Sequence, residues 1–138
     1  MTTMLSPAVG DSLPEFTRTT DFAHWNRYAA VNDEFVPIHM DDEAGRAAGY
    51  SGAFGMGNLQ WAYLHNLLRD WLGDTGRIVS LRCRFSAVNT RGMTVTARGT
   101  VTAVRAEDGL RMVDLDVWTE DQDGNRIAPG TAVVELDD

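Results

Sequence analysis

The strongest constraint on the fold is a helical segment that is apolar almost all the way round. A glycine-rich stretch ends near Gly57, and a helix of about four turns is expected to follow it over 58–72. Its apolar residues are Leu59, Trp61, Ala62, Leu64, Leu67, Leu68 and Trp71. A helix with so little polar face is buried on most of its sides, so another layer must cover it. Gly73 and Gly76 are expected to end this helix.

The second half of the chain alternates between apolar and polar residues with the period of a half-buried β-strand. The apolar sets are Val79, Leu81, Cys83, Phe85 and Ala87; Met93, Val95, Ala97, Val101 and Ala103; and Val113, Leu115 and Val117. A last strand is expected over 131–136, and turns over 89–92, 107–109 and 121–124. Long strands joined by tight turns predict an antiparallel sheet with one polar face. Together the two halves predict an α+β fold in which a strongly curved sheet wraps around one long central helix.

Shorter elements precede the apolar helix. The predicted elements are an edge strand over 11–19 that contains Pro14, a helix that Thr20 or Asp21 caps and that runs to about Ala30, a loop over 32–38 held by Pro37, and a short helix that Asp41 or Asp42 opens and Gly49 closes. No internal repeat or linker interrupts this order, so residues 1–138 are expected to form one domain.

Charge and cysteine content exclude several classes of function. The net charge is −8, and all 12 basic residues are arginines, with no basic cluster among them. Such a chain repels nucleic acid and anionic membranes, so neither is an expected partner. Cys83 is the single cysteine and the histidines are scattered, so we expect no intrachain disulfide and no zinc site. No signal peptide is visible over 1–10, and a cytoplasmic location is the expectation.

Two short segments could carry chemistry. Over 32–39, Asp33 and Glu34 precede His39 by five or six residues across the loop that Pro37 fixes. A carboxylate and an imidazole can hold a water molecule and deprotonate it, although a loop carboxylate can equally be only solvated. Over 54–57, glycines open the apolar helix, whose first N–H groups are free donors. These glycines either allow a ligand oxygen to approach or only allow tight packing of helix on sheet.

The spacing of these segments resembles MaoC-type (R)-specific enoyl-CoA hydratases of the hot-dog fold. That family's motif runs Tyr-Ala, two residues, Ser-Gly-Asp-x-Asn-Pro-Ile/Leu-His-x-Asp, and a His-Gly-Met turn later opens the central helix. Here the chain reads YAAVNDEFVPIHMDDE over 28–43, with His39 on the family's catalytic histidine and Gly57 on its oxyanion-hole glycine. The stretch LRCRFSAVNTRGMTVTARGTV over 81–101 resembles the family's hairpin after the helix. The resemblance begins at about Leu13.

This resemblance implies hydration of a trans-2-enoyl-CoA thioester, or the reverse dehydration. Glu34 or Asp33, with His39, would activate the water, and the N–H of Gly57 would hold the thioester oxygen. The resemblance also implies four substrate-binding residues, of which Arg84 is the candidate for the CoA phosphates unless it is an ordinary exposed charge. These residues are Asn32, Met56, Asn58 and Arg84. No metal or cofactor is implied, and the implied assembly is a homodimer or a heterodimer with another hot-dog subunit.

The chain departs from the family motif at several positions. An ungapped comparison puts Glu34 in the slot of the catalytic aspartate and Asp33 on the family glycine, whereas a one-residue bulge would put Asp33 in that slot. Val36 stands on the family asparagine, Met56 on the turn histidine and Asn58 on the turn methionine.

These departures suggest a different acyl group or a weakened catalyst. The alternative function is therefore a non-catalytic or half-site subunit of a heteromeric hydratase. A hot-dog thioesterase ranks last, because that class usually carries a carboxylate on the central helix and this helix has only Asp70, near its far end.

Overall fold

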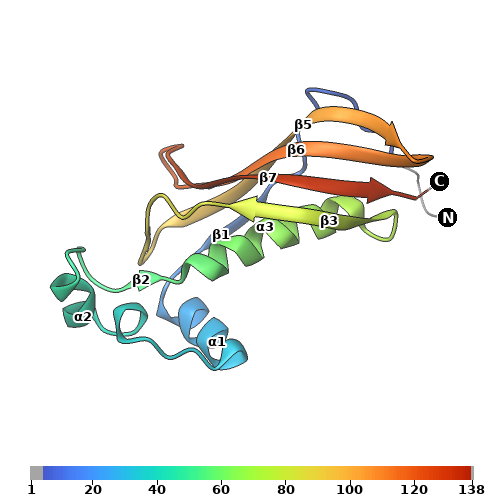
Figure 1. Ribbon diagram of the computed structural model, residues 1–138. Helices are drawn as coiled ribbons and strands as arrows, with labels where there is room; N and C mark the ends of the chain where they lie inside the picture. Colours follow the sequence, from blue (N-terminus) through green and yellow to red (C-terminus); the bar gives the residue numbers. More distant parts are fainter. Residues whose placement is uncertain (1–4, 138) are drawn as a thin grey trace.

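A five-stranded antiparallel sheet curls over one long helix in the computed structural model, which describes residues 5–137 (Figure 1). The sheet has the order β1-β5-β6-β7-β3, and β2 pairs with β4 in a separate two-stranded ribbon. The strands are β1 (Phe16–Thr19), β2 (Phe54–Gly55), β3 (Gly76–Cys83), β4 (Asn89–Thr90), β5 (Thr94–Glu107), β6 (Leu110–Glu120) and β7 (Arg126–Leu136). The helices are α1 (Phe22–Asn32), α2 (Asp42–Ala47) and α3 (Gly57–Leu72), and a 3₁₀ turn spans Pro37–His39. The predicted α+β architecture is confirmed.

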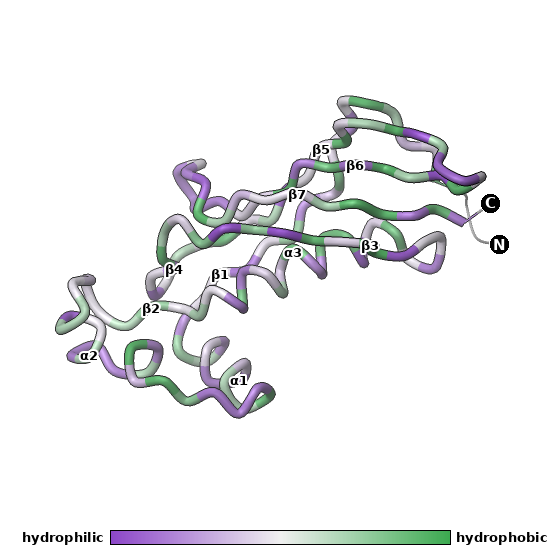
Figure 2. The backbone as a smooth tube through the Cα atoms, viewed as in Figure 1, coloured by the Kyte–Doolittle hydropathy of each residue, from purple (hydrophilic) through white to green (hydrophobic). Residues whose placement is uncertain are grey.

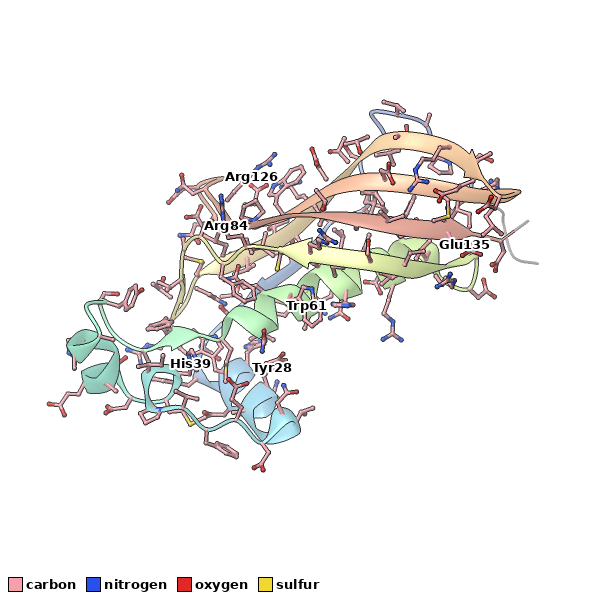
Figure 3. All side chains as sticks on the ribbon, in the orientation of Figure 1. Tyr28, His39, Trp61, Arg84, Arg126 and Glu135 are labelled. Atoms are coloured by element: carbon pink, nitrogen blue, oxygen red, sulfur yellow. The ribbon has the colours of Figure 1, made fainter. Side chains whose placement is uncertain are left out.

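Helix α3 forms the centre of the core, as its apolar sequence predicts. Leu64, Leu67 and Leu68 are fully buried in the apolar cluster that also contains the inward side chains of β5, β6 and β7. The prediction of burial on most sides is too strong at one position, because Trp61 remains 40% exposed. The sheet ends at the edge strand β3, and Trp61 of α3 lies beside that edge (Figure 3).

The predicted alternation holds in β5 and β6 and for Leu81 and Cys83 of β3, but it is wrong at Val79. Val79 was expected to share a face with Leu81 and Cys83, yet it is 42% exposed. The pairing of β3 with β7 shifts register between Ile78 and Ser80, and an extra residue in a strand reverses the faces of all residues on one side of it. Ile78 consequently replaces Val79 on the inner face. The remaining alternation along β3 is visible in Figure 2.

The ends of several strands also differ from the prediction. The first edge strand covers only the second half of 11–19, because Pro14 cannot donate to the ladder and only an isolated bridge between Ser12 and Thr100 precedes β1. Strand β3 ends at Cys83, so Phe85 lies outside the ladder and is 48% exposed. Strand β7 begins five residues before the predicted 131–136, at Arg126.

Helices α1 and α2 lie together at one end of the sheet, beside β2 and the start of α3 (Figure 1). Asp21 caps α1 by accepting a hydrogen bond from the N–H of Ala23, and Asp41 caps α2 by accepting from the N–H of Glu43. These caps were expected from the sequence as one of two alternatives each. Trp25 of α1 is fully buried and anchors this part of the chain to the core. The chain between the two helices carries the predicted catalytic segment.

Candidate active site

His39 is held in one orientation at the end of the 3₁₀ turn. Its side chain is buried, and Nδ1 lies 2.7 Å from the carbonyl oxygen of Phe54. The Phe54 ring meets the imidazole edge to face, with 5.3 Å between the ring centroids. Because a carbonyl can only accept, Nδ1 carries the hydrogen, and Nε2 of the neutral ring keeps its lone pair. Figure 3 shows His39 next to β2, on the side of the molecule where α1 lies. The imidazole is therefore oriented to act as a base or an acceptor.

The two candidate carboxylates occupy different positions in the loop after α1. Asp33 ends the helix in the left-handed conformation, with φ of 52°, and its side chain is exposed. This conformation favours Gly, Asn and Asp, which accounts for an aspartate where the resembled motif has glycine. Glu34 follows it and is partly buried, and its N–H donates to the carbonyl oxygen of Ala29 at 3.0 Å. Within residues 5–137 neither carboxylate hydrogen-bonds to His39, so no preassembled pair exists.

The N-terminus of α3 opens into a cavity of about 270 Å³. Met56 is the N-cap residue and no side chain caps the helix, so the first N–H groups are left without such a partner. The cavity is lined by Tyr50, Phe54, Gly55, Gly57, Gln60, Phe85, Ser86, Ala87 and Val88. A Cβ atom on Gly57 would lie only 2.5 Å from the ring of Phe85. Gly57 therefore allows close packing against Phe85 and also leaves the start of α3 open to the cavity. Both roles that the sequence suggested for these glycines, tight packing and the approach of a ligand oxygen, are compatible with this position.

The predicted substrate-binding residues are not brought together. None of these four residues lines the cavity at Gly57. Asn32 is exposed and donates from Nδ2 to the carbonyl oxygen of Tyr28 at 3.1 Å, and Met56 is buried in the core. Asn58 faces a second groove, which Trp61 also lines. Asn32, Met56 and Asn58 are therefore not placed to contact one ligand together.

Arg84 lies apart from His39, at the end of the sheet (Figure 3). It lines an open groove together with Arg82, Cys83, Pro129, Gly130 and Thr131. The backbone N–H of Arg84 donates to the carbonyl oxygen of Pro129 at 2.9 Å, which fixes the chain where it leaves β3. From there the next residues, Phe85 and Ser86, line the cavity at Gly57. The arginine groove and the cavity are thus neighbours along one segment.

Sequence reasoning missed Gln60 as a cavity residue. Gln60 is 1% exposed, and its Oε1 accepts a hydrogen bond from Oγ1 of Thr119 at 2.6 Å. The available signal was a polar residue among the apolar residues of the first turns of α3, one turn after Gly57. Its partner lies 59 positions away in the sequence. No local pattern could have indicated that pairing.

The comparisons with known proteins agree with this geometry. A family model described as a MaoC like domain matches residues 7–122. The chain belongs to the MaoC-like family. No curated protein sequence matches it.

Solved structures with the same fold include two (R)-hydratases and a chain of a two-component complex. The (R)-hydratase from A. caviae involved in PHA biosynthesis is 23% identical, with a TM-score of 0.84 over 95% of this chain and 98% of that chain. R-hydratase PhaJ1 from Pseudomonas aeruginosa is 17% identical, with a TM-score of 0.85 over 96% of this chain and 83% of that one. A chain of the ChsH1-ChsH2 complex from Mycobacterium tuberculosis is 24% identical, with a TM-score of 0.82 over 95% and 99%. The predicted hot-dog fold is therefore confirmed.

Two further features of this MaoC-like chain bear on its chemistry. Among residues 5–137, no three His, Cys, Asp or Glu side chains lie close enough together to hold a metal ion. In the same part of the chain, no helix is both long and apolar enough to cross a membrane.

Asp42 joins α2 to the segment that leads to the candidate active site. Its Oδ1 accepts a hydrogen bond from the N–H of Ala53 at 3.0 Å, and its Oδ2 accepts from Nη2 of Arg91 at 2.9 Å. The bond from Ala53 and then the interaction with Arg91 lower the pKa of the Asp42 carboxyl. A carboxyl whose pKa is lowered on folding stabilises the native state above its unfolded pKa, and this contribution is lost as the pH falls through the folded pKa.

We therefore predict that Asp42→Asn lowers the melting temperature at pH 7 and flattens the loss of stability in acid. The difference in stability should begin to shrink as the pH falls below about 4, the unfolded pKa, and should vanish at the lower pH where the folded carboxyl becomes protonated. Thermal unfolding followed by circular dichroism between neutral and acidic pH measures this difference. Glu43→Gln, on the exposed face of the same helix, controls for the loss of one negative charge. Parallel curves for Asp42→Asn and wild type would contradict the prediction.

Proposed function

We propose that the chain catalyses the (R)-specific hydration of a trans-2-enoyl-CoA thioester, or the reverse dehydration of a 3-hydroxyacyl-CoA. The observation that carries the proposal is the link between His39 and the start of α3. The imidazole is fixed to the carbonyl oxygen of Phe54, and Gly57 begins the uncapped helix only three residues later. A base is thereby tied by a hydrogen bond to the segment that also carries the free N–H donors, and hydration of an enoyl thioester requires both kinds of group.

Glu34 is the proposed partner of His39. Asp33 is exposed and serves as the left-handed end of α1, whereas Glu34 is partly buried in the same loop. In the proposed reaction, Glu34 and His39 hold a water molecule between them, and one of them takes its proton as the general base. The hydroxide adds to the β-carbon, the α-carbon receives a proton from the conjugate acid, and the sum is addition of one water to the double bond.

The thioester oxygen gains negative charge while the β-carbon is attacked. The N–H of Gly57, at the positive end of the α3 dipole, is the proposed donor to this oxygen. Much of the cavity lining is apolar, because Tyr50, Phe54, Phe85 and Val88 contribute to it. Such walls exclude water from the enolate and strengthen that hydrogen bond. The groove with Arg82 and Arg84 is the proposed contact for the CoA phosphates, because two arginines line it.

A second hot-dog subunit is part of the proposal. Among residues 5–137, no strand pairs with the outer edge of β3, and Trp61 and Phe85 beside it are exposed. An open strand edge next to exposed aromatic side chains needs a partner to prevent aggregation. A second copy or another MaoC-like chain would both serve.

The alternative is a half-site or non-catalytic subunit of a heteromeric hydratase. Val36 and Met56 favour it, because they replace an asparagine and a histidine of the resembled motif. The similarity to a chain of the ChsH1-ChsH2 complex also supports this alternative. A thioesterase is disfavoured, since the carboxylate of α3, Asp70, is exposed near the far end of the helix from the cavity.

The decisive experiment is hydration of crotonyl-CoA and of a longer enoyl-CoA by the purified chain alone, followed at the enoyl absorbance band. Loss of absorbance with formation of the (3R)-hydroxyacyl product is the expected result. Release of free thiol would instead indicate a thioesterase. Activity that appears only after a second MaoC-like chain is added would favour the heteromeric alternative.

A further inference from the structure

Gln60 has a half-satisfied side chain in the wall of the candidate active site. It is 1% exposed and lines the same cavity as Gly57. Its Oε1 accepts from Thr119, which is itself fully buried, while its amide nitrogen has no hydrogen-bond partner within residues 5–137. The NH₂ group can donate to a ligand that brings an acceptor into the cavity.

The nitrogen of Gln60 has access to the cavity. The fully enclosed side-chain atoms without a partner, among the described residues, are Trp25 Nε1, Tyr63 Oη, Asn89 Nδ2 and Arg111 Nε. The nitrogen of Gln60 is not one of them, so it reaches the cavity that this residue lines. Since the oxygen of the amide is engaged by Thr119, the nitrogen is the atom left for a ligand.

Helix geometry directs this side chain toward Gly57. Gln60 follows Gly57 by three positions, so both lie on one face of α3. Side chains on a helix lean toward its N-terminus and cover the preceding turn. The amide of Gln60 and the N–H groups of the first turn therefore converge on the same end of the cavity. The cavity thus has two kinds of donor, the Gln60 amide and the backbone N–H groups, and no carboxylate is among its lining residues. This combination suits a ligand oxygen that carries partial negative charge.

We propose that the Gln60 side-chain NH₂ is a second donor to the carbonyl oxygen of the acyl thioester, beside the N–H of Gly57. This inference rests on the proposed function and deepens it, because it assigns a substrate contact at the same site. Thr119 acts as the positioning residue that holds the Gln60 oxygen and so turns the nitrogen toward the ligand. The donor is held before the substrate arrives, so little reorganisation is needed as the oxygen gains charge.

The test separates binding of the carbonyl from binding of the rest of the ligand. Butyryl-CoA carries the thioester carbonyl, whereas the thioether S-butyl-CoA lacks it. We expect Gln60→Leu to weaken butyryl-CoA binding by about 3- to 10-fold in calorimetry, the value of one hydrogen bond. Affinity for S-butyl-CoA should stay the same. In crotonyl-CoA hydration, kcat should fall by about 100-fold with a smaller change in KM, since the bond strengthens in the transition state.

Gln60→Glu keeps the fold testable if Gln60→Leu is unstable, because a glutamate oxygen can still accept from Thr119. In its ionised form it replaces the donor by an acceptor, so the same selective loss of butyryl-CoA affinity is expected at alkaline pH, where the carboxyl is ionised. Asn66→Asp makes the matched change on the same helix outside the cavity, and its affinities should equal those of wild type.

Each outcome decides one of the two proposals. Equal losses for the two ligands, or no loss for either, would overturn the role of Gln60, as would failure of the wild-type chain to bind butyryl-CoA. A wild-type chain that binds butyryl-CoA in a Gln60-dependent way but does not hydrate crotonyl-CoA would overturn the proposed function and leave the assignment of Gln60 standing.

Discussion

Replacing His39 by alanine is expected to reduce hydration of crotonyl-CoA by about 100- to 10,000-fold, the range supplied by one general acid–base group. The loss should appear in kcat, because Nε2 acts on the water and not on the bound CoA. The imidazole is buried and bonded to the carbonyl oxygen of Phe54, so the variant also leaves that oxygen unpaired. A destabilisation of about 1–3 kcal/mol should accompany the loss of activity.

A second variant separates catalysis from folding at this position. In His39→Asn, the side-chain amide can place an N–H near the position of Nδ1 and donate to Phe54, but it offers no base. We expect a melting temperature closer to wild type than that of His39→Ala, with equal loss of turnover. Circular dichroism and the crotonyl-CoA assay together measure both quantities. Unchanged turnover in either variant would refute the assigned site.

The second large effect is expected at Glu34. Glu34→Gln should lower kcat by at least about 100-fold, because the amide can still hold water but cannot take its proton. Asp33→Asn is the matched change one position earlier, and asparagine tolerates the left-handed conformation found there. Its turnover should fall far less than that of Glu34→Gln.

Comparing the two amides identifies the catalytic carboxylate. The assay is hydration of crotonyl-CoA at several pH values, with thermal unfolding to verify that each variant folds. A larger loss in Asp33→Asn than in Glu34→Gln would reverse the assignment and place Asp33 in the acid position. Equal and small losses in both would favour the non-catalytic subunit.

Local patterns in the sequence predicted the architecture. The apolar stretch over 58–72 and the alternation after it show which face of each helix or strand is buried. This information lies within the residues of the element itself. The resemblance over 28–43 correctly indicated the family. The left-handed residue at the end of α1 explains why Asp33 stands on a family glycine, although that conformation was not predicted.

Contacts between distant segments decided the rest. Val79 left the inner face because β3 and β7 pair with a bulge, and Trp61 stayed exposed because the sheet ends at β3. The orientation of His39 depends on the Phe54 carbonyl, and that of Gln60 depends on Thr119. The sequence by itself thus determined which elements form, since periodicity is local. Only the tertiary structure decided which polar atoms are paired and which remain free for a ligand, because hydrogen bonds between remote segments exist only after the elements pack.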